Sequence, residues 1–180
     1  MSTSDELYRI AYDELRGLAR HYLQGDGAAG TIRPTELVSE AVTNLYGKVD
    51  FKDQQHLVAT LARAMRRVLV NAARERSRLR HGNNAVHVTL YEGARVTSDH
   101  TVDVLAIDSA LETLAEKKVR VAQVAEMTIF SGFTQDEIAN QLGVTKRTVV
   151  NDWALARAWL ARELDLRPAR SSDQDASSPR

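Results

Sequence analysis

The chain lacks several features that define large classes of protein. It contains no cysteine, so neither a disulfide framework nor a thiolate metal site is available. No apolar run approaches the roughly 20 residues that a membrane helix needs, and the first residues lack the basic and apolar segments of a signal peptide. With 180 residues, of which 43% are hydrophobic, the chain has enough apolar material for one ordinary domain or two small ones. We therefore expect a soluble cytoplasmic protein.

The sequence also lacks the usual signs of an enzyme. Its five histidines are scattered along the chain, with no metal-ligand spacing and no paired nucleophile. No glycine-rich phosphate loop is present. We therefore expect no catalytic activity, no cofactor, no metal site, no small-molecule substrate and no membrane association.

Net charge is absent as well, but the zero total conceals an uneven distribution. Residues 56–82 contain seven arginines against the single acidic residue Glu75, whereas residues 1–55 contain nine acidic and six basic residues. A concentrated basic segment in a neutral chain indicates a local site for a polyanion beside acidic surfaces for another partner.

Hydrophobic periodicity predicts an all-α protein made of two small helical domains. In the first domain, residues 1–82, one helix ends before Gly25, a second runs from Pro34 to Gly47, and a third covers about 54–80. The second domain, residues 105–167, has expected helices at 105–114, 117–130, 134–142 and 145–164. Residues 83–104 form the predicted linker. Within it, residues 86–90 alternate as a strand does but have no partner strand in reach, so we interpret them as extended chain. Residues 168–180 have nothing to bury and are predicted to be disordered. We expect the two domains to pack against each other only weakly.

The segment from Thr134 to Leu164 has the layout of a helix-turn-helix. Thr134 and Glu137 have the spacing of a capping box, and Gly143 stands where the chain must turn sharply. Thr145 is placed to cap the second helix, whose N-terminal end enters the major groove in this motif. The predicted DNA contacts are Thr145, Lys146, Arg147, Thr148, Asn151 and Arg157. An ordinary helical hairpin with a glycine turn is the plainer interpretation, but the agreement of caps, turn and apolar positions favours DNA binding.

Two further surfaces stand out in the first domain. Arginines 63, 67, 74 and 78 lie near one side of the third helix, with Arg66 at the edge of that side, and phosphate contact is a natural role for them. The alternative is a solvated face paired with acidic residues of the first two helices. A polar stripe on the second helix, made of Glu36, Ser39, Glu40 and Asn44, is either its wet side or a docking surface for a basic partner.

The residues at 30–41, 61–70 and 143–160 together resemble a sigma-70-type factor of the extracytoplasmic-function group. The resemblance covers roughly residues 5–165 and rests on blocks from both domains of that family, in the expected order. It implies a factor that binds core RNA polymerase and directs it to promoter DNA, with an anti-sigma factor as a possible further partner.

The resemblance implies a role for each surface. The helix-turn-helix is similar to the module that reads the −35 element and contacts the β flap of polymerase. The stripe Glu36, Ser39, Glu40 and Asn44 is similar to the surface that binds the β′ clamp. The implied −10 contacts are Phe51, Lys52, Arg63, Arg66, Arg67, Asn71 and Arg74. Phe51 supplies either a stacking face for a flipped base or a core anchor for its loop.

The chain departs from relatives in two respects. Val150 and Asn151 stand where many relatives carry basic residues, which implies fewer −35 contacts or a different preference. The basic helix lacks the aromatic residues that primary sigma factors use for melting. Two rival interpretations remain: a helix-turn-helix regulator that acts without polymerase, and a sigma mimic that sequesters an anti-sigma factor.

Overall fold

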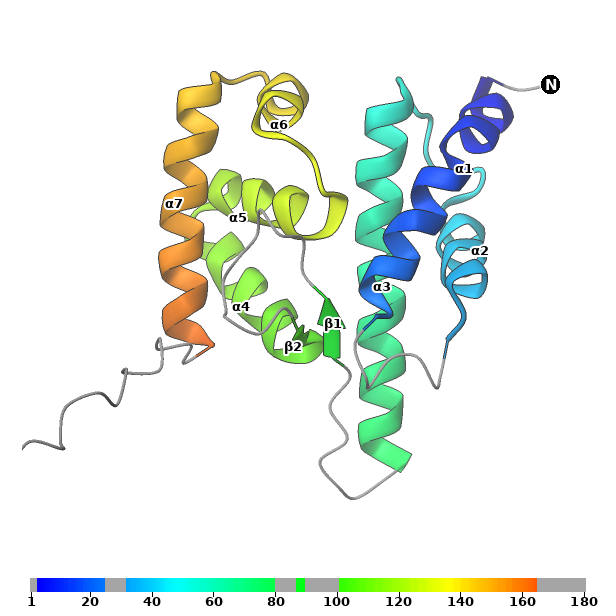
Figure 1. Cartoon of the computed structure of the whole chain (residues 1–180), viewed down its shortest axis with the longest axis horizontal. Coiled ribbons are helices and arrows are strands. Elements are labelled where there is room, and N and C mark those ends of the chain that lie inside the picture. The colour runs from blue at the N-terminus through cyan, green and yellow to red at the C-terminus, as the bar shows by residue number, and fades with distance from the viewer. Residues whose placement is uncertain (1–2, 25–31, 80–86, 90–100, 165–180) are drawn as a thin grey trace, which may run out of the picture.

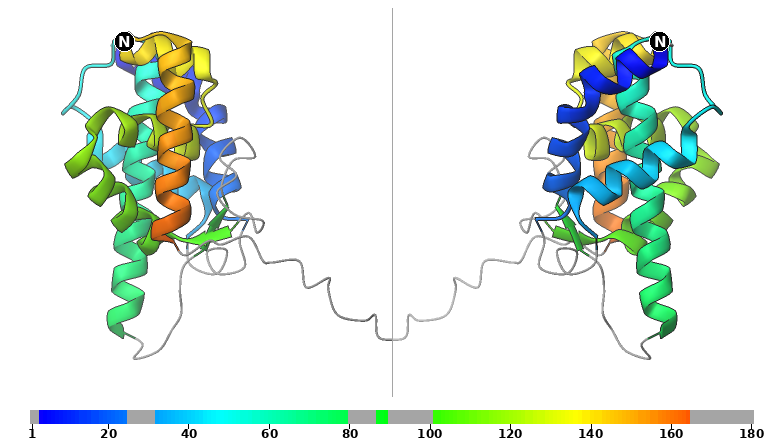
Figure 2. Two further views of the ribbon diagram at one scale, coloured as in Figure 1. Left: turned by 90° about the vertical axis from the view of Figure 1, so that its left-hand side faces the viewer. Right: turned by 90° about the vertical axis from the view of Figure 1, so that its right-hand side faces the viewer.

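The structure, a computed structural model, is helical and describes residues 3–24, 32–79, 87–89 and 101–164. Its longest helix, α3 (Gln54–Leu79), stands between α1 and α2 on one side and α4 to α7 on the other (Figure 1). The C-terminal end of α3 projects past the neighbouring helices in both side views (Figure 2). The predicted all-α class is confirmed. Among the described helices, none is long and apolar enough to cross a bilayer.

The first group of helices consists of α1 (Thr3–Tyr22), α2 (Pro34–Leu45) and α3. Pro34 opens α2, as expected for a residue whose missing N–H costs nothing in a first turn. The Asp53 carboxylate caps α3 by accepting a hydrogen bond of 2.7 Å from the His56 backbone N–H. The three helices pack through buried aliphatic side chains, among them Leu15, Leu37 and Leu61. Local signals therefore define where α2 and α3 begin.

A short antiparallel strand pair joins the helical groups. Strand β1 (His87–Thr89) pairs with β2 (Thr101–Asp103), with Val88 opposite Val102. The prediction that the strand-like segment has no partner was wrong. Its partner follows within the expected linker, immediately before α4, so a local hairpin-type pairing satisfies the extended backbone.

The second group contains α4 (Val104–Lys117), α5 (Val119–Glu126), a π-helical turn η2 (Met127–Ser131), α6 (Gln135–Leu142) and α7 (Lys146–Glu163). Asp103 caps α4 through a hydrogen bond of 3.1 Å from the Leu105 N–H. The expected single helix over 117–130 is divided, because α4 continues to Lys117 and the last turn widens into η2. The predicted tail at 168–180 lies outside the described residues, as does most of the predicted linker.

The two groups pack directly against each other. The side of α3 that faces away from α1 and α2 contacts α4, η2 and α6. The rings of Tyr22 and Phe130 meet edge to face, with centroids 5.8 Å apart, and both are almost completely buried. The sequence predicted only weak packing here. It did not reveal that an aromatic pair and several ion pairs would form across this boundary.

Candidate nucleic-acid interface

The turn between α6 and α7 has the geometry that its sequence predicts. The Thr134 N–H donates to the Glu137 carboxylate at 2.7 Å, and the Glu137 N–H donates to Thr134 Oγ1 at 3.3 Å, which completes the capping box. Gly143 ends α6 in the left-handed conformation, with φ of 64°. The Val144 N–H then donates to the Ala139 carbonyl at 3.0 Å, so the turn satisfies the exposed end of α6.

A shared core fixes the angle between these two helices. Ile138 on α6 and Val149 on α7 are completely buried or nearly so, and Trp153 is 8% exposed. Leu142 and Val144 pack at the edge of the same cluster. These five apolar residues therefore hold the two helices together.

Five of the six predicted −35 residues lie at the N-terminal half of α7 or at its cap, and Arg157 lies in its second half. Thr145 caps the helix, its Oγ1 accepting from the Thr148 N–H at 3.2 Å, so both threonines serve the start of the helix. Lys146 lies 2.7 Å from the Asp136 carboxylate in an exposed pair. Arg147, Asn151 and Arg157 are exposed. Val150 is 41% exposed and interrupts this polar surface with an apolar side chain.

An ion pair beneath α7 was not predicted from the sequence. Arg120 on α5 donates from Nε to the Asp152 carboxylate at 2.6 Å. Asp152 is only 8% exposed, and its hydrogen bond raises the pKa of the Arg120 guanidinium further above its ordinary value. A carboxylate on the buried side of a helix is the signal that indicates such a partner. The pair holds α7 on α5, and so orients its exposed face.

The basic surface of α3 contains exposed residues and residues that are paired with other helices. Arg67 and Asn71 are exposed, and they border a pocket of about 290 Å³ between α3 and α4. Arg66 and Arg74 line the same pocket from α3. The pocket also contains the carboxylates of two α4 residues, so its lining carries both charge signs.

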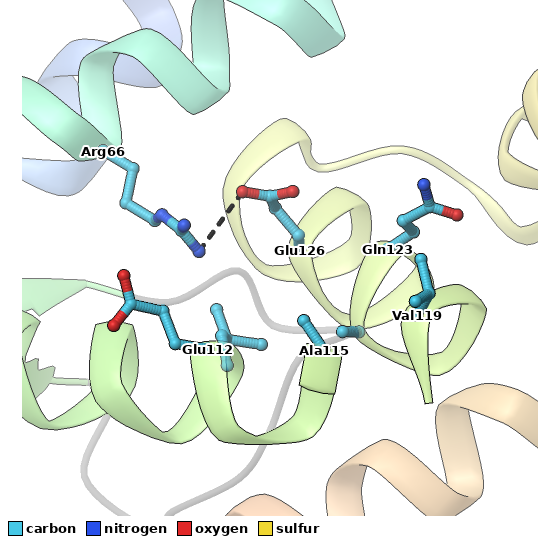
Figure 3. A pocket seen from close by; sticks show the side chains of 8 residues that line it. Arg66, Glu112, Ala115, Val119, Gln123 and Glu126 are labelled. Atoms are coloured by element: carbon cyan, nitrogen blue, oxygen red, sulfur yellow. Dashed lines mark ion pairs between the residues drawn. The ribbon is translucent and has the colours of Figure 1, made fainter. Parts of the chain in front are cut away.

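Three of the predicted −10 arginines form ion pairs with the second group of helices. Arg63 Nε lies 2.8 Å from Glu126 Oε2, and Arg66 Nη1 lies 3.2 Å from Glu126 Oε1. Arg66 Nε is also 3.5 Å from Asp108 Oδ1, and Arg74 Nη2 is 3.4 Å from Asp108 Oδ2. Figure 3 shows Arg66 extending from α3 toward Glu126 on α5. The alternative interpretation, in which the basic face forms ion pairs with acidic residues of other helices, therefore holds for Arg63, Arg66 and Arg74. Their acidic partners belong to α4 and α5, whereas α1 or α2 was expected.

Asp108 is the most buried member of this cluster. Its side chain is 7% exposed, and burial raises its pKa above the ordinary value, an effect that the positive charge of Arg66 opposes. Asp108 was not predicted from the sequence, although a signal exists. Asp108 lies on the apolar face of α4 between Val104 and Leu111, where a lone carboxylate needs a cationic partner.

The loop before α3 holds its aromatic residue inward. Phe51 is 9% exposed, and its ring meets Tyr8 edge to face with centroids 5.5 Å apart. This position matches the core-anchor interpretation of Phe51 more closely than an open stacking face. Lys52 beside it is exposed.

The predicted polymerase-binding residues form an exposed face of α2. Glu36, Ser39, Glu40 and Asn44 are all exposed. The Glu36 carboxylate also accepts a hydrogen bond from the Arg33 N–H at 3.3 Å, so it helps to start the helix. Helices α2 and α7 lie at opposite sides of the molecule (Figure 1). The α2 and α7 sets therefore lie apart, and of the −10 set Arg66, Arg67, Asn71 and Arg74 line one pocket.

Comparison with known proteins gives a family. A family model described as ECF sigma factor matches residues 1–166, nearly the whole chain. Neither the search of curated proteins nor that of solved structures found a match. The matched region contains the helix-turn-helix, the arginine-rich helix and the exposed α2 face. The chain therefore belongs to the ECF sigma factors, a family of non-enzymatic, DNA-binding factors for transcription initiation.

Proposed function

We propose that the protein binds core RNA polymerase and directs it to specific promoters by recognising their −35 and −10 elements. In this proposal residues 1–82 form the polymerase-binding and −10 domain, residues 83–104 the linker, and residues 105–167 the −35 domain. The observation that carries it is the exposed N-terminal half of α7, held by the Gly143 turn and the Arg120–Asp152 pair.

The −35 part of the proposal follows from the side chains on that surface. Arg147 and Asn151 are exposed and one helical turn apart, as a helix entering the major groove requires. Arginine bonds the acceptors of guanine, and asparagine bonds adenine through both a donor and an acceptor. Lys146 and Arg157 add positive charge for phosphate contacts.

The −10 part rests on α3. Arg67 and Asn71 lie exposed on the side of the helix that carries Arg63 and Arg74, so a single strand following this side would meet positive charge and an amide. The polymerase contact rests on the α2 face, whose two glutamates would meet basic groups of the β′ clamp. The β flap would bind the −35 domain.

Reconstituted transcription tests the proposal. The protein is mixed with core polymerase and a genomic promoter library, and start sites are sequenced. We expect specific transcripts, and we expect Arg147→Ala to reduce their yield about tenfold or more, because a bidentate base contact contributes about 1–3 kcal/mol. Arg162→Ala, in the last turn of the same helix, is the matched control and should leave the yield near that of the wild type.

Other outcomes would separate the rival functions. A protein that binds duplex DNA but not core polymerase would be a regulator acting on its own. A protein that binds neither but captures an anti-sigma factor would be a mimic. Either result would contradict the proposed function.

A further inference from the structure

The ion pairs between α3 and the second group of helices involve the same arginines that we assign to the −10 strand. Glu126 contacts both Arg63 and Arg66, and Asp108 contacts both Arg66 and Arg74. Arg66 is the most enclosed of the three, with a side chain only 14% exposed. A DNA phosphate that binds these arginines would compete with the two carboxylates.

Apolar packing reinforces this arrangement. The Arg66 guanidinium lies 5.6 Å from the centre of the Phe130 ring, and the same ring also contacts Tyr22 of α1. The π-helical turn η2 presents Phe130 at this boundary. A pocket at the same boundary is lined by Arg66, Ala115, Val119 and Glu126 (Figure 3). The boundary is thus closed by both charge and aromatic contact.

The same boundary also contains interactions that are unfavourable in the closed arrangement. The Nε atoms of Arg63 and Arg66 are buried, and neither N–H is aligned for a hydrogen bond despite the nearby carboxylates. A buried donor without an aligned acceptor destabilises a structure. Burial of the Asp108 carboxylate adds a further cost, as its raised pKa indicates. These costs fall on the contact between the groups and would be relieved by separation.

We infer that the structure is a self-masked form, in which Asp108 and Glu126 of the second helical group occupy the DNA-binding arginines of α3 until the two groups separate. This inference rests on the proposed −10 role of α3 and adds a regulatory step to it. The carboxylates act as a substitute for DNA phosphates, so the −10 surface becomes available only in an open form. An open fraction of about one tenth would weaken strand binding about tenfold.

The test uses the full chain and reverses one charge. Glu126→Lys places a cation against Arg63 and Arg66, whereas Glu116→Lys makes the same change at an exposed position of α4. Because the chain has no cysteine, Asp13→Cys on α1 and Ala158→Cys on α7 accept one dye pair for energy transfer. Strand affinity is measured separately, by anisotropy of a labelled single-stranded 20-mer of mixed sequence.

We expect Glu126→Lys to lower the energy transfer and to bind the single strand about tenfold more tightly. Glu116→Lys should stay close to the wild type in energy transfer and in strand affinity. Glu126→Gln should shift both readouts in the same direction by less, and it serves if the lysine variant does not fold. Unchanged energy transfer in both Glu126 variants would overturn the inference, as would an equal gain in affinity for Glu116→Lys.

A failure of the underlying function would look different. Arg67 is exposed and takes no part in the masking contacts described above. If Arg67→Ala abolishes transcription while the Glu126 variants stay closed, the −10 role stands and the masking is wrong. If the Glu126 variants open without binding the strand more tightly, and Arg67→Ala transcribes normally, the −10 assignment itself is wrong and the masking falls with it.

Discussion

At the scale of single residues, the most informative side chain is Asp108, a carboxylate that the fold largely buries. Arg66 and Arg74 approach it from α3, Glu112 lies on its own helix, and Glu126 faces it from α5. Burial, the largest effect, raises its pKa, Arg66 and Arg74 lower it, and Glu112 and Glu126 raise it further, so that the pKa lies above its ordinary value. The ionised form is therefore less favourable in the folded protein than in water, even with cations beside it.

This imbalance predicts a dependence on pH. A carboxyl group with a raised pKa contributes stability that is fully present below its ordinary pKa of about 3.9 and is lost as the pH rises through the raised value. Asp108→Asn removes this dependence. We therefore expect the free energy of unfolding of Asp108→Asn to increase relative to wild type as the pH rises from about 4 toward neutrality. Urea unfolding of both proteins at a series of pH values measures the difference. A difference that falls with pH would show that the arginines outweigh burial.

At the scale of elements, the helix-turn-helix depends on one backbone conformation. Gly143 has φ of 64°, and a Cβ added there would meet no atom within 4 Å, so a substitution costs strain without a clash. Gly17, in the middle of α1, also has free space around it but has ordinary helical geometry. The same substitution at these two positions should therefore have opposite effects.

We expect Gly143→Ala to destabilise the protein by about 1–2 kcal/mol, the cost of a left-handed conformation for alanine. Gly17→Ala should stabilise it by up to about 1 kcal/mol, because glycine weakens a helix interior. Thermal unfolding of the two variants and the wild type provides the comparison. Gly143→Asn should cost less than Gly143→Ala, since asparagine tolerates this region. Equal effects of alanine at both positions would contradict the role given to the turn.

The sequence predicts an element well when the residues that stabilise it are close to it in the chain. The Thr134–Glu137 cap, the Gly143 turn and the Asp53 cap all lie within a few residues of what they stabilise, and all were predictable. The pairing of His87–Thr89 with Thr101–Asp103 spans the linker, and periodicity alone does not detect a partner at that distance. The contacts of Glu126 with α3 depend on how helices pack in three dimensions, so the sequence predicted the arginines but not the residues that mask them.

At the scale of the whole molecule, closure combines a charged contact and an aromatic one that respond differently to salt. The Arg63 and Arg74 side chains are 37% and 53% exposed, so their ion pairs are open to screening. The Tyr22–Phe130 contact is buried and apolar, and salt does not weaken it.

Raising the salt concentration should therefore open the molecule only in part. The distance over which exposed charges interact shortens from about 10 Å at 0.1 M salt to about 3 Å at 1 M. With the dye pair at positions 13 and 158, we expect the energy transfer of the wild type to fall over this range and to level off above the value of Glu126→Lys. That variant, already open, should change little. A rise in energy transfer with salt would mean that the apolar contact alone closes the protein.

The β1–β2 pair has a consequence for reach. Because His87 lies opposite Asp103, which directly precedes α4, the chain effectively crosses from Leu79 of α3 to the second group over only eight residues. Eight extended residues span at most about 28 Å, roughly the diameter of a small domain. If the three-residue ladder melted, the tether between Leu79 and Val104 would contain 24 residues and would extend to about 85 Å. The ladder therefore limits the length of the tether and, under the proposed function, would limit how far apart along DNA the two proposed recognition helices can lie.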